Sequence, residues 1–173
     1  YKLEYKVNNT LKRTCLSTPF SSALCFIGEI LPQYEFSVSL KIIHPEMKAS
    51  TISERLSMQP EMCSDVGADR KSKGGRLLGG VYESTIWSKS LSSGKIDAEE
   101  MLFEDFVSDQ NFSLSKHQKF FKDVRETGGS IEYFVGWFSS GSINMNIVFE
   151  PELMQKTSAL GVTIVLCAYP DNE

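Results

Sequence analysis

A run of strict alternation between apolar and polar side chains, which begins at Tyr34 and stops before Pro45, restricts the fold more than any other feature. Its apolar members are Phe36, Val38, Leu40 and Ile42, and its polar members are Ser37, Ser39 and Lys41. Successive side chains of a β-strand point to opposite faces of the sheet, so the pattern predicts a strand with one buried face. The fold must therefore contain a sheet that other elements cover on one side.

Weaker patterns predict the remaining elements. Strands are expected at 82–91, 130–138 and 162–169, with a further candidate at 143–149. Helices are expected from the capping-box sequence at 51–54, over 97–109, from a second capping box at 115–118, and over 151–160. The predicted fold class is α+β, an antiparallel or mixed sheet of four to five strands with helices packed on one face, in ferredoxin-like β-α-β-α-α-β-(β)-α-β order. Residues 1–33 are expected to form an N-terminal extension with a hairpin, and residues 34–173 a single domain.

The composition is that of an ordinary globular chain. With 173 residues, 41% of them hydrophobic, and a mean hydropathy of -0.18, the chain can bury its own core. A net charge of -4 argues against a nucleic-acid partner, which requires clustered Lys and Arg. Pro19 and Glu29 interrupt the apolar stretch 16–31, so no membrane partner is expected. Sparse cysteines without a Cys-x-x-Cys pair predict free thiols and a cytoplasmic location.

No set of side chains in the sequence forms recognisable catalytic chemistry. The histidines are His44 and His117, and neither has a Cys, Asp or Glu at the spacing of a metal site or a nucleophile relay. This pattern favours binding over catalysis without deciding whether the chain is an enzyme, and no cofactor or metal is expected. Trp87, Trp137 and His117 fall on apolar stripes, which predicts that they pack in the core.

A cluster of acidic residues is the most uneven feature of the charge distribution. Within 97–109 the chain carries six carboxylates and no basic side chain: Asp97, Glu99, Glu100, Glu104, Asp105 and Asp109. Metal ligands must converge, whereas the carboxylates of a single helix radiate from its axis, so a metal site is disfavoured. Two interpretations stay open, a solvated helix face and a negative surface that captures a basic partner.

A glycine-rich basic segment, Gly67–Gly80, is the second candidate site. Its cations are Arg70, Lys71, Lys73 and Arg76. Backbone N–H groups beside such cations can hold a phosphate, but the spacing matches neither Gly-x-x-x-x-Gly-Lys-Ser/Thr nor Gly-x-Gly-x-x-Gly. The pattern therefore predicts a mobile surface loop, with an anion site as the alternative.

From Tyr34 to the C-terminus the order of motifs resembles a bacterial family, the domain-of-unknown-function family numbered 4279. The residues that carry the resemblance are Tyr34-Glu35-Phe36, Leu56-Ser57-Met58-Gln59-Pro60, the glycine-rich segment before Trp87-Ser88-Lys89-Ser90, and Phe149-Glu150-Pro151-Glu152-Leu153 through Leu160-Gly161 to Tyr169. The resemblance implies a small partner-binding protein of the kind that includes toxin-neutralising immunity proteins. It implies no catalytic residues.

These observations together predict a non-enzymatic, bacterial, immunity-type protein that binds and neutralises a toxin enzyme. The predicted contact residues are Asp97, Glu100, Glu104 and Asp105 in the acidic cluster and Arg70, Lys71, Lys73 and Arg76 in the basic segment. The alternative is a small enzyme or ligand-binding domain that recognises an anionic small molecule through the basic segment.

Overall fold

The computed structural model describes residues 34–72, 74–139 and 147–169, and their fold is α+β. The elements in chain order are β1 (Tyr34–His44), α1 (Ala49–Leu56), β2 (Met62–Ser64), β3 (Asp69–Lys71), β4 (Leu77–Val81), β5 (Thr85–Ser90), β6 (Ile96–Asp97), α2 (Phe103–Leu114), the 3-10 turn η1 (Ser115–His117), α3 (Gln118–Glu126), β7 (Ser130–Ser139), α4 (Pro151–Leu160) and β8 (Thr163–Tyr169). The predicted α+β class with a mixed sheet is confirmed.

The main sheet is mixed and has the strand order β2-β5-β1-β7-β8, with the short β6 also paired to β1. Strand β1 is antiparallel to both β5 and β7, whereas β7 and β8 run parallel. This sheet therefore has six strands, more than predicted, because β2 and β6 are too short to leave a periodic signal. Strands β3 and β4 form a separate two-stranded sheet.

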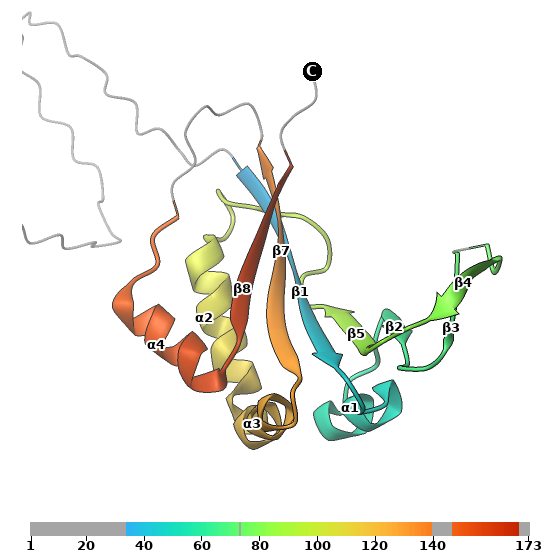
Figure 1. Cartoon of the computed structure of the whole chain (residues 1–173). Helices are drawn as coiled ribbons and strands as arrows, with labels where there is room; N and C mark the ends of the chain where they lie inside the picture. Colours follow the sequence, from blue (N-terminus) through green and yellow to red (C-terminus); the bar gives the residue numbers. More distant parts are fainter. Residues whose placement is uncertain (1–33, 73, 140–146, 170–173) are drawn as a thin grey trace, which may run out of the picture. The chain divides into compact units, whose positions relative to one another are not determined.

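The core lies on one face of the main sheet. Every second side chain of β1 is buried, and the register places Phe36 opposite Trp137 and Ile42 opposite both Ile131 and Trp87. Figure 1 shows α2, α3 and α4 together on one side of the sheet, as predicted. The alternation that predicted β1 is thus the alternation between a helix-covered face and an open face.

The structure corrects two predicted helix starts. The first helix begins at Ala49 with no side-chain cap from its N-cap residue, and the carboxylate of Asp65 accepts the Ala49 N–H at 2.7 Å instead. A distant carboxylate therefore takes the place of the predicted capping box. The second capping box is also absent, because Ser115 stays in helical conformation and continues α2 through η1 toward α3.

The sequence predicted a single helix over 97–109, but the structure does not have one there. Asp97 lies in β6 and its carboxylate accepts the N–H of Glu99 at 2.8 Å, while α2 begins only at Phe103. An aspartate that bonds its own downstream backbone favours a turn over a helix. The predicted mobile loop is likewise a hairpin, β3–β4, which extends away from the main sheet in Figure 1.

Two further expectations lie wholly or partly outside the described residues. The N-terminal hairpin of residues 1–33 and most of the candidate strand at 143–149 belong there, and the described stretch 147–150 has no strand. Among the described helices, none combines the length and apolar character needed to cross a membrane.

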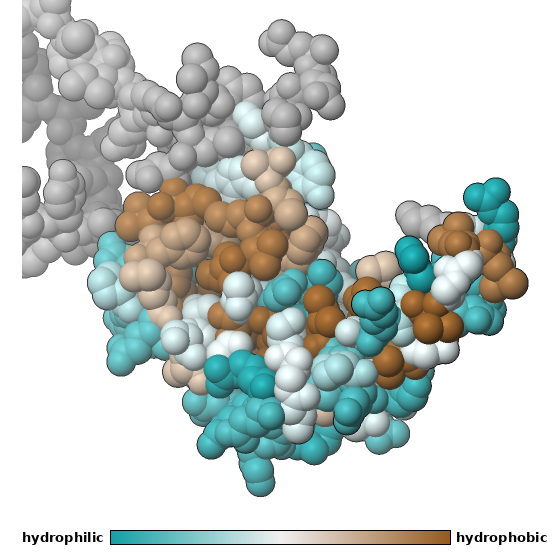
Figure 2. Space-filling model, in the orientation of Figure 1, coloured by the Kyte–Doolittle hydropathy of each residue, from teal (hydrophilic) through white to brown (hydrophobic). Residues whose placement is uncertain are grey.

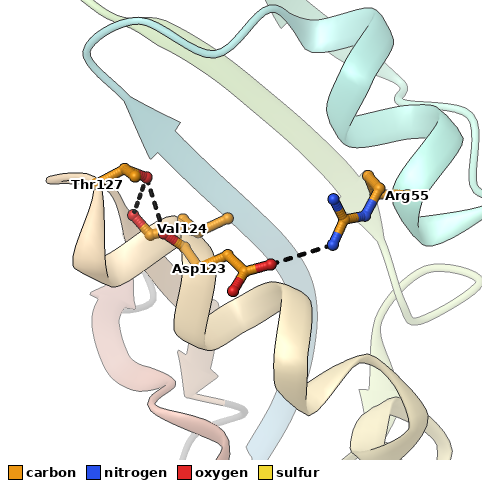
Figure 3. Close-up of polar contacts among 4 residues, drawn as sticks. All are labelled: Arg55, Asp123, Val124 and Thr127. Atoms are coloured by element: carbon orange, nitrogen blue, oxygen red, sulfur yellow. Dashed lines mark hydrogen bonds and ion pairs between the residues drawn. The ribbon is translucent and has the colours of Figure 1, made fainter.

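An ion pair connects helices α1 and α3 near the end of β1. Figure 3 shows the Arg55 guanidinium on α1 reaching the Asp123 carboxylate on α3, with 3.2 Å between the two groups. At the end of α3 the Thr127 hydroxyl lies 2.8 Å from the Asp123 carbonyl and 3.2 Å from the Val124 carbonyl. Thr127 also meets His44 from β1, which connects the helix end to the sheet.

Candidate functional site

Helices α2 and α4 are held side by side by a buried chain of hydrogen bonds. The Asn111 amide nitrogen on α2 donates to the Thr157 hydroxyl on α4 at 2.8 Å, and the Tyr133 hydroxyl on β7 donates to the Asn111 amide oxygen at 3.1 Å. Thr157 in turn donates to the Leu153 carbonyl at 2.9 Å. A fully satisfied buried network specifies one arrangement of the elements that it joins. The spacing between α2 and α4 is therefore well defined.

A groove follows the outer surface between these helices. It consists of a hollow of about 270 Å³ toward the first turns of α2 and α4 and one of about 520 Å³ toward their last turns. Ser108 and Lys156 line both hollows, so the two are adjacent. We call this feature the α2–α4 groove, and its walls differ in character along its length.

The first part of the α2–α4 groove is acidic. Its carboxylates come from both helices and from the residue before α4: Glu104, Asp105, Glu150 and Glu152. The Glu104 carboxylate accepts the Val148 N–H at 2.6 Å, and Lys156 forms an ion pair with Glu152 at 2.9 Å. The hydrogen bond that Lys156 donates to the Glu152 carboxylate, and then the charge of Lys156, lower the pKa of the Glu152 carboxyl. One cation therefore faces several carboxylates, and the negative charge is in excess.

The second part of the α2–α4 groove has apolar side chains, Phe112 among them, next to polar ones that include Asp109. Phe112 is 84% exposed, although it belongs to a well-formed helix. Ala159 and Leu160 form the opposite wall on α4. An aromatic side chain that remains in water without filling the core is typical of a binding hot spot, because aromatics provide most apolar contact area at interfaces.

The groove contains part of the predicted acidic site. Glu104 and Asp105 line it, whereas Asp97 and Glu100 precede α2 and do not line either hollow. Glu150 and Glu152 could not be predicted as site residues, because only the folding of α4 against α2 brings them near Glu104. Phe112 could have been recognised, since it lies off the helical stripe of Phe103, Phe106 and Val107.

The basic segment does not form an anion cradle. Arg70 and Lys71 are neighbours on β3, so strand geometry directs them to opposite faces, and Lys73 lies outside the described residues. The hollow of about 480 Å³ at the base of the hairpin is lined by Arg70 and also by Glu83. Arg76 is exposed just before β4 and does not line that hollow.

The β3–β4 hairpin is instead an exposed apolar arm with a basic rim. Leu77, Leu78 and Val81 are 63%, 50% and 51% exposed, and every residue of β3 and β4 is accessible to solvent. An isolated two-stranded hairpin is marginal in water because it buries little apolar surface. A partner that covers these aliphatic side chains would stabilise it.

The buried histidine of β1 has a structural role. Two backbone N–H groups, from Glu46 and Met47, donate to Nδ1 of His44 at 3.0 and 2.8 Å. Nδ1 is therefore the acceptor, and Nε2 carries the proton toward the Thr127 hydroxyl at 2.8 Å. Burial lowers the pKa of His44, with Glu46 opposing that shift in part. Both ring nitrogens are thus occupied.

His117 and the acidic side chains likewise form no converging site in the described part of the chain. Burial, and secondarily Lys116, lower the pKa of His117, whose Nε2 is buried without a hydrogen-bond partner among the described residues. Within residues 34–72, 74–139 and 147–169, no His, Cys, Asp and Glu side chains group together as metal ligands would.

The open face of the main sheet pairs its charges internally. Lys95 contacts the Glu35 carboxylate at 2.8 Å and lies 4.1 Å from the centre of the Phe138 ring. Lys41 contacts Glu132 at 3.6 Å. Phe138 also stacks on Tyr169, with 5.0 Å between the ring centres. The α2–α4 groove, with unbalanced charge and an exposed aromatic ring, is therefore the better candidate site.

Comparison with known proteins yields no match to a family model, to a curated protein or to a solved structure. The resemblance to the family numbered 4279 consequently remains a prediction from the motifs, and the site must be interpreted from its own geometry.

Proposed function

We propose that the protein is a non-enzymatic binding protein whose α2–α4 groove receives a basic protein partner. The observation that carries the proposal is the combination, in one groove, of carboxylates from two helices at one end and the exposed ring of Phe112 at the other. An immunity-type protein, which blocks a toxin enzyme in the bacterial cytoplasm, is the proposed biological role.

In this proposal, charge determines the rate of association and apolar burial determines the rate of dissociation. Carboxylates at the rim attract a basic surface over about a Debye length, ~10 Å at 0.1 M salt, and so accelerate encounter. Apolar contact with Phe112 then slows dissociation, because water is excluded around a buried aromatic ring. A solvated acidic face alone would need no exposed ring, which favours the interpretation as an interface.

The β3–β4 hairpin is the proposed second contact. Its aliphatic side chains Leu77, Leu78 and Val81 and its cations Arg70 and Arg76 suit an apolar patch with an acidic edge on the same partner. Lys71 and Lys73, which the sequence analysis predicts as contact residues, are part of the same proposed contact. The hairpin adds contact area, while the α2–α4 groove determines the charge of the partner.

Site-specific photo-crosslinking tests the proposal in the cells from which the gene comes. A photoreactive phenylalanine analogue replaces Phe112, and a control protein carries the same analogue at Lys122, which is exposed on α3. We expect the analogue at position 112 to crosslink to one basic protein that the analogue at position 122 does not capture. Replacement of Glu104 and Asp105 by Lys should abolish this crosslinked product. An acidic partner, or the same products from both positions, would refute the proposal.

A further inference from the structure

Strand β8 ends the main sheet with a long edge. It spans seven residues, Thr163–Tyr169, and pairs on one side with β7, while the opposite end of the sheet is the three-residue strand β2. Within the described residues no strand pairs with the outer side of β8. Unpaired backbone groups at such an edge form a template for another strand, and proteins usually shield them with charges, prolines or very short strands.

The sequence of β8 has none of these shields. It reads Thr-Ile-Val-Leu-Cys-Ala-Tyr, without a charged residue, proline or glycine, although 23% of the whole chain is charged. Its β-branched and aromatic residues favour extended structure. The short β2, by contrast, pairs with β5, and Lys89 of β5 forms an ion pair with Glu61, the residue before β2. The two edges of the sheet are therefore protected very differently.

An apolar groove accompanies the unshielded edge. A hollow of about 560 Å³ lies between α4 and β8, and Phe149, Met154, Ile164 and Leu166 line it. Met154 is 51% and Leu166 44% exposed. Figure 2 shows a continuous hydrophobic area over the region that α4 and β8 occupy in Figure 1. Backbone hydrogen-bonding capacity and exposed apolar surface thus coincide at this edge.

We propose that β8 pairs antiparallel with β8 of a second copy of the chain, about a two-fold axis that passes by Leu166. Leu166 is the middle residue of the strand, so this register pairs all seven residues and places Thr163 opposite the second copy's Tyr169. The main sheets of both copies then form one continuous sheet. A two-fold interface uses the same surface on both copies, which makes it self-complementary by construction.

The absence of charge on β8 permits a second copy as the occupant. Copies of a chain with net charge -4 repel each other in general, but the uncharged β8 lets two of them meet without like charges in contact. The groove's one cation is Arg125, whose guanidinium lies where a side chain at Gly161 would begin. In the proposed register the two Gly161 positions are about 33 Å apart along the strands, well beyond the ~10 Å Debye length at 0.1 M salt.

This dimer is independent of the proposed function, because Glu104, Asp105 and Phe112 line the α2–α4 groove and not the groove beside β8. The failure of either proposal would leave the other standing.

Sedimentation equilibrium of the full chain between about 1 and 100 μM tests the dimer, with Leu166→Lys and Leu166→Glu as charge variants. Each substitution places like charges opposite each other at the two-fold axis, which destabilises a strand pair. We expect the wild type to dimerise and each variant to raise the dissociation constant at least about tenfold. An equimolar mixture of the variants should form a heterodimer, since Lys then faces Glu.

The matched control is Leu78→Lys, because Leu78 is 50% exposed and lies on β4, away from β8. It should leave the wild-type dissociation constant unchanged, and circular dichroism verifies that every variant is folded. A monomeric wild type at 100 μM would overturn the proposal. So would variants that dimerise like the wild type, or a mixture that stays monomeric, since a purely structural role for Leu166 would not be rescued by mixing.

Discussion

Truncation of Trp87 to alanine should strongly destabilise the protein, because the side chain is buried in the core. Trp87 is fully buried on β5 of the main sheet, opposite Ile42 of β1, and its indole N–H donates to the Ser53 hydroxyl on α1 at 3.0 Å. The substitution therefore empties a core site and removes a contact between the sheet and α1.

The size of the effect follows from the buried area. An aromatic side chain buries roughly 150 to 250 Å², which at about 25 cal/mol per Å² amounts to roughly 4 to 6 kcal/mol. This is an upper value, because an unfolded chain already buries part of its apolar surface. Measured losses for Trp or Phe to Ala in cores are about 3 to 5 kcal/mol, and we expect Trp87→Ala to fall in that range.

Urea unfolding followed by far-UV circular dichroism measures this loss, with Phe112→Ala as the matched control. Phe112 is also an aromatic residue but is 84% exposed, so its truncation should change the free energy of unfolding by less than about 0.5 kcal/mol. Trp137→Ala, at 4% exposure, should resemble Trp87→Ala. Equal unfolding free energies for Trp87→Ala and Phe112→Ala would refute the assignment of Trp87 to the core.

Three further perturbations test local parts of the fold. Ser53→Ala should cost about 1 to 3 kcal/mol in urea unfolding, because the buried Trp87 indole N–H loses its acceptor. Gly129→Ala should cost about 1 to 3 kcal/mol, since its Cβ would lie 2.6 Å from the His44 ring and 2.9 Å from the Ile43 carbonyl, whereas Gly74→Ala meets only one atom, at 3.9 Å. Burial lowers the pKa of His44 in the folded state, so the stability that its neutral form contributes should be complete above pH ~6.5 and decline as pH falls toward the folded pKa.

Each of these predictions has its own contradicting result. A Ser53→Ala protein as stable as the wild type would mean that water or another group serves the indole. Equal stability of Gly129→Ala and Gly74→Ala would disprove close packing at Gly129. The pH dependence belongs in a His117→Gln background, because the pKa of His117 is lowered too. A free energy of unfolding that rises as the pH falls from 7 to 5 would contradict the role of His44. So would a His44→Gln variant whose stability has the same pH dependence as that of its parent.

The parts of the fold that could be predicted are the elements whose structure depends on a local pattern of residues. The alternation over 34–44 predicted β1. Pro151, the first residue of α4, and Gly161, which follows its last residue, predicted the two ends of that helix. Gly161 ends the helix because it adopts the left-handed conformation, with φ of 71°. These signals are local. The start of α1 was misplaced because its N-terminal N–H finds Asp65, which no local pattern can indicate.

The candidate site was predicted only in part for the same reason. Glu104 and Asp105 stood out as acidic residues, but a run of charge in the sequence does not show that the Asp97 carboxylate accepts the Glu99 N–H and that Asp97 lies outside the helix. The opposite wall depends on α4 lying beside α2, and the Asn111–Thr157 hydrogen bond that joins them links residues 46 positions apart. Tertiary contacts, and not composition, make the groove.

The most direct test of the central claim is the association rate of the crosslinked partner, measured by stopped-flow at increasing salt. Charge reversal of Glu104 and Asp105 to Lys is compared with reversal of Glu54 and Glu126, which are exposed on α1 and α3, outside both proposed contacts, and change the net charge equally. Binding through the α2–α4 groove predicts an association rate that falls with salt and that falls strongly only for the Glu104 and Asp105 variant. A rate that ignores salt, or that both double variants lower equally, would contradict the claim that this groove binds a basic partner.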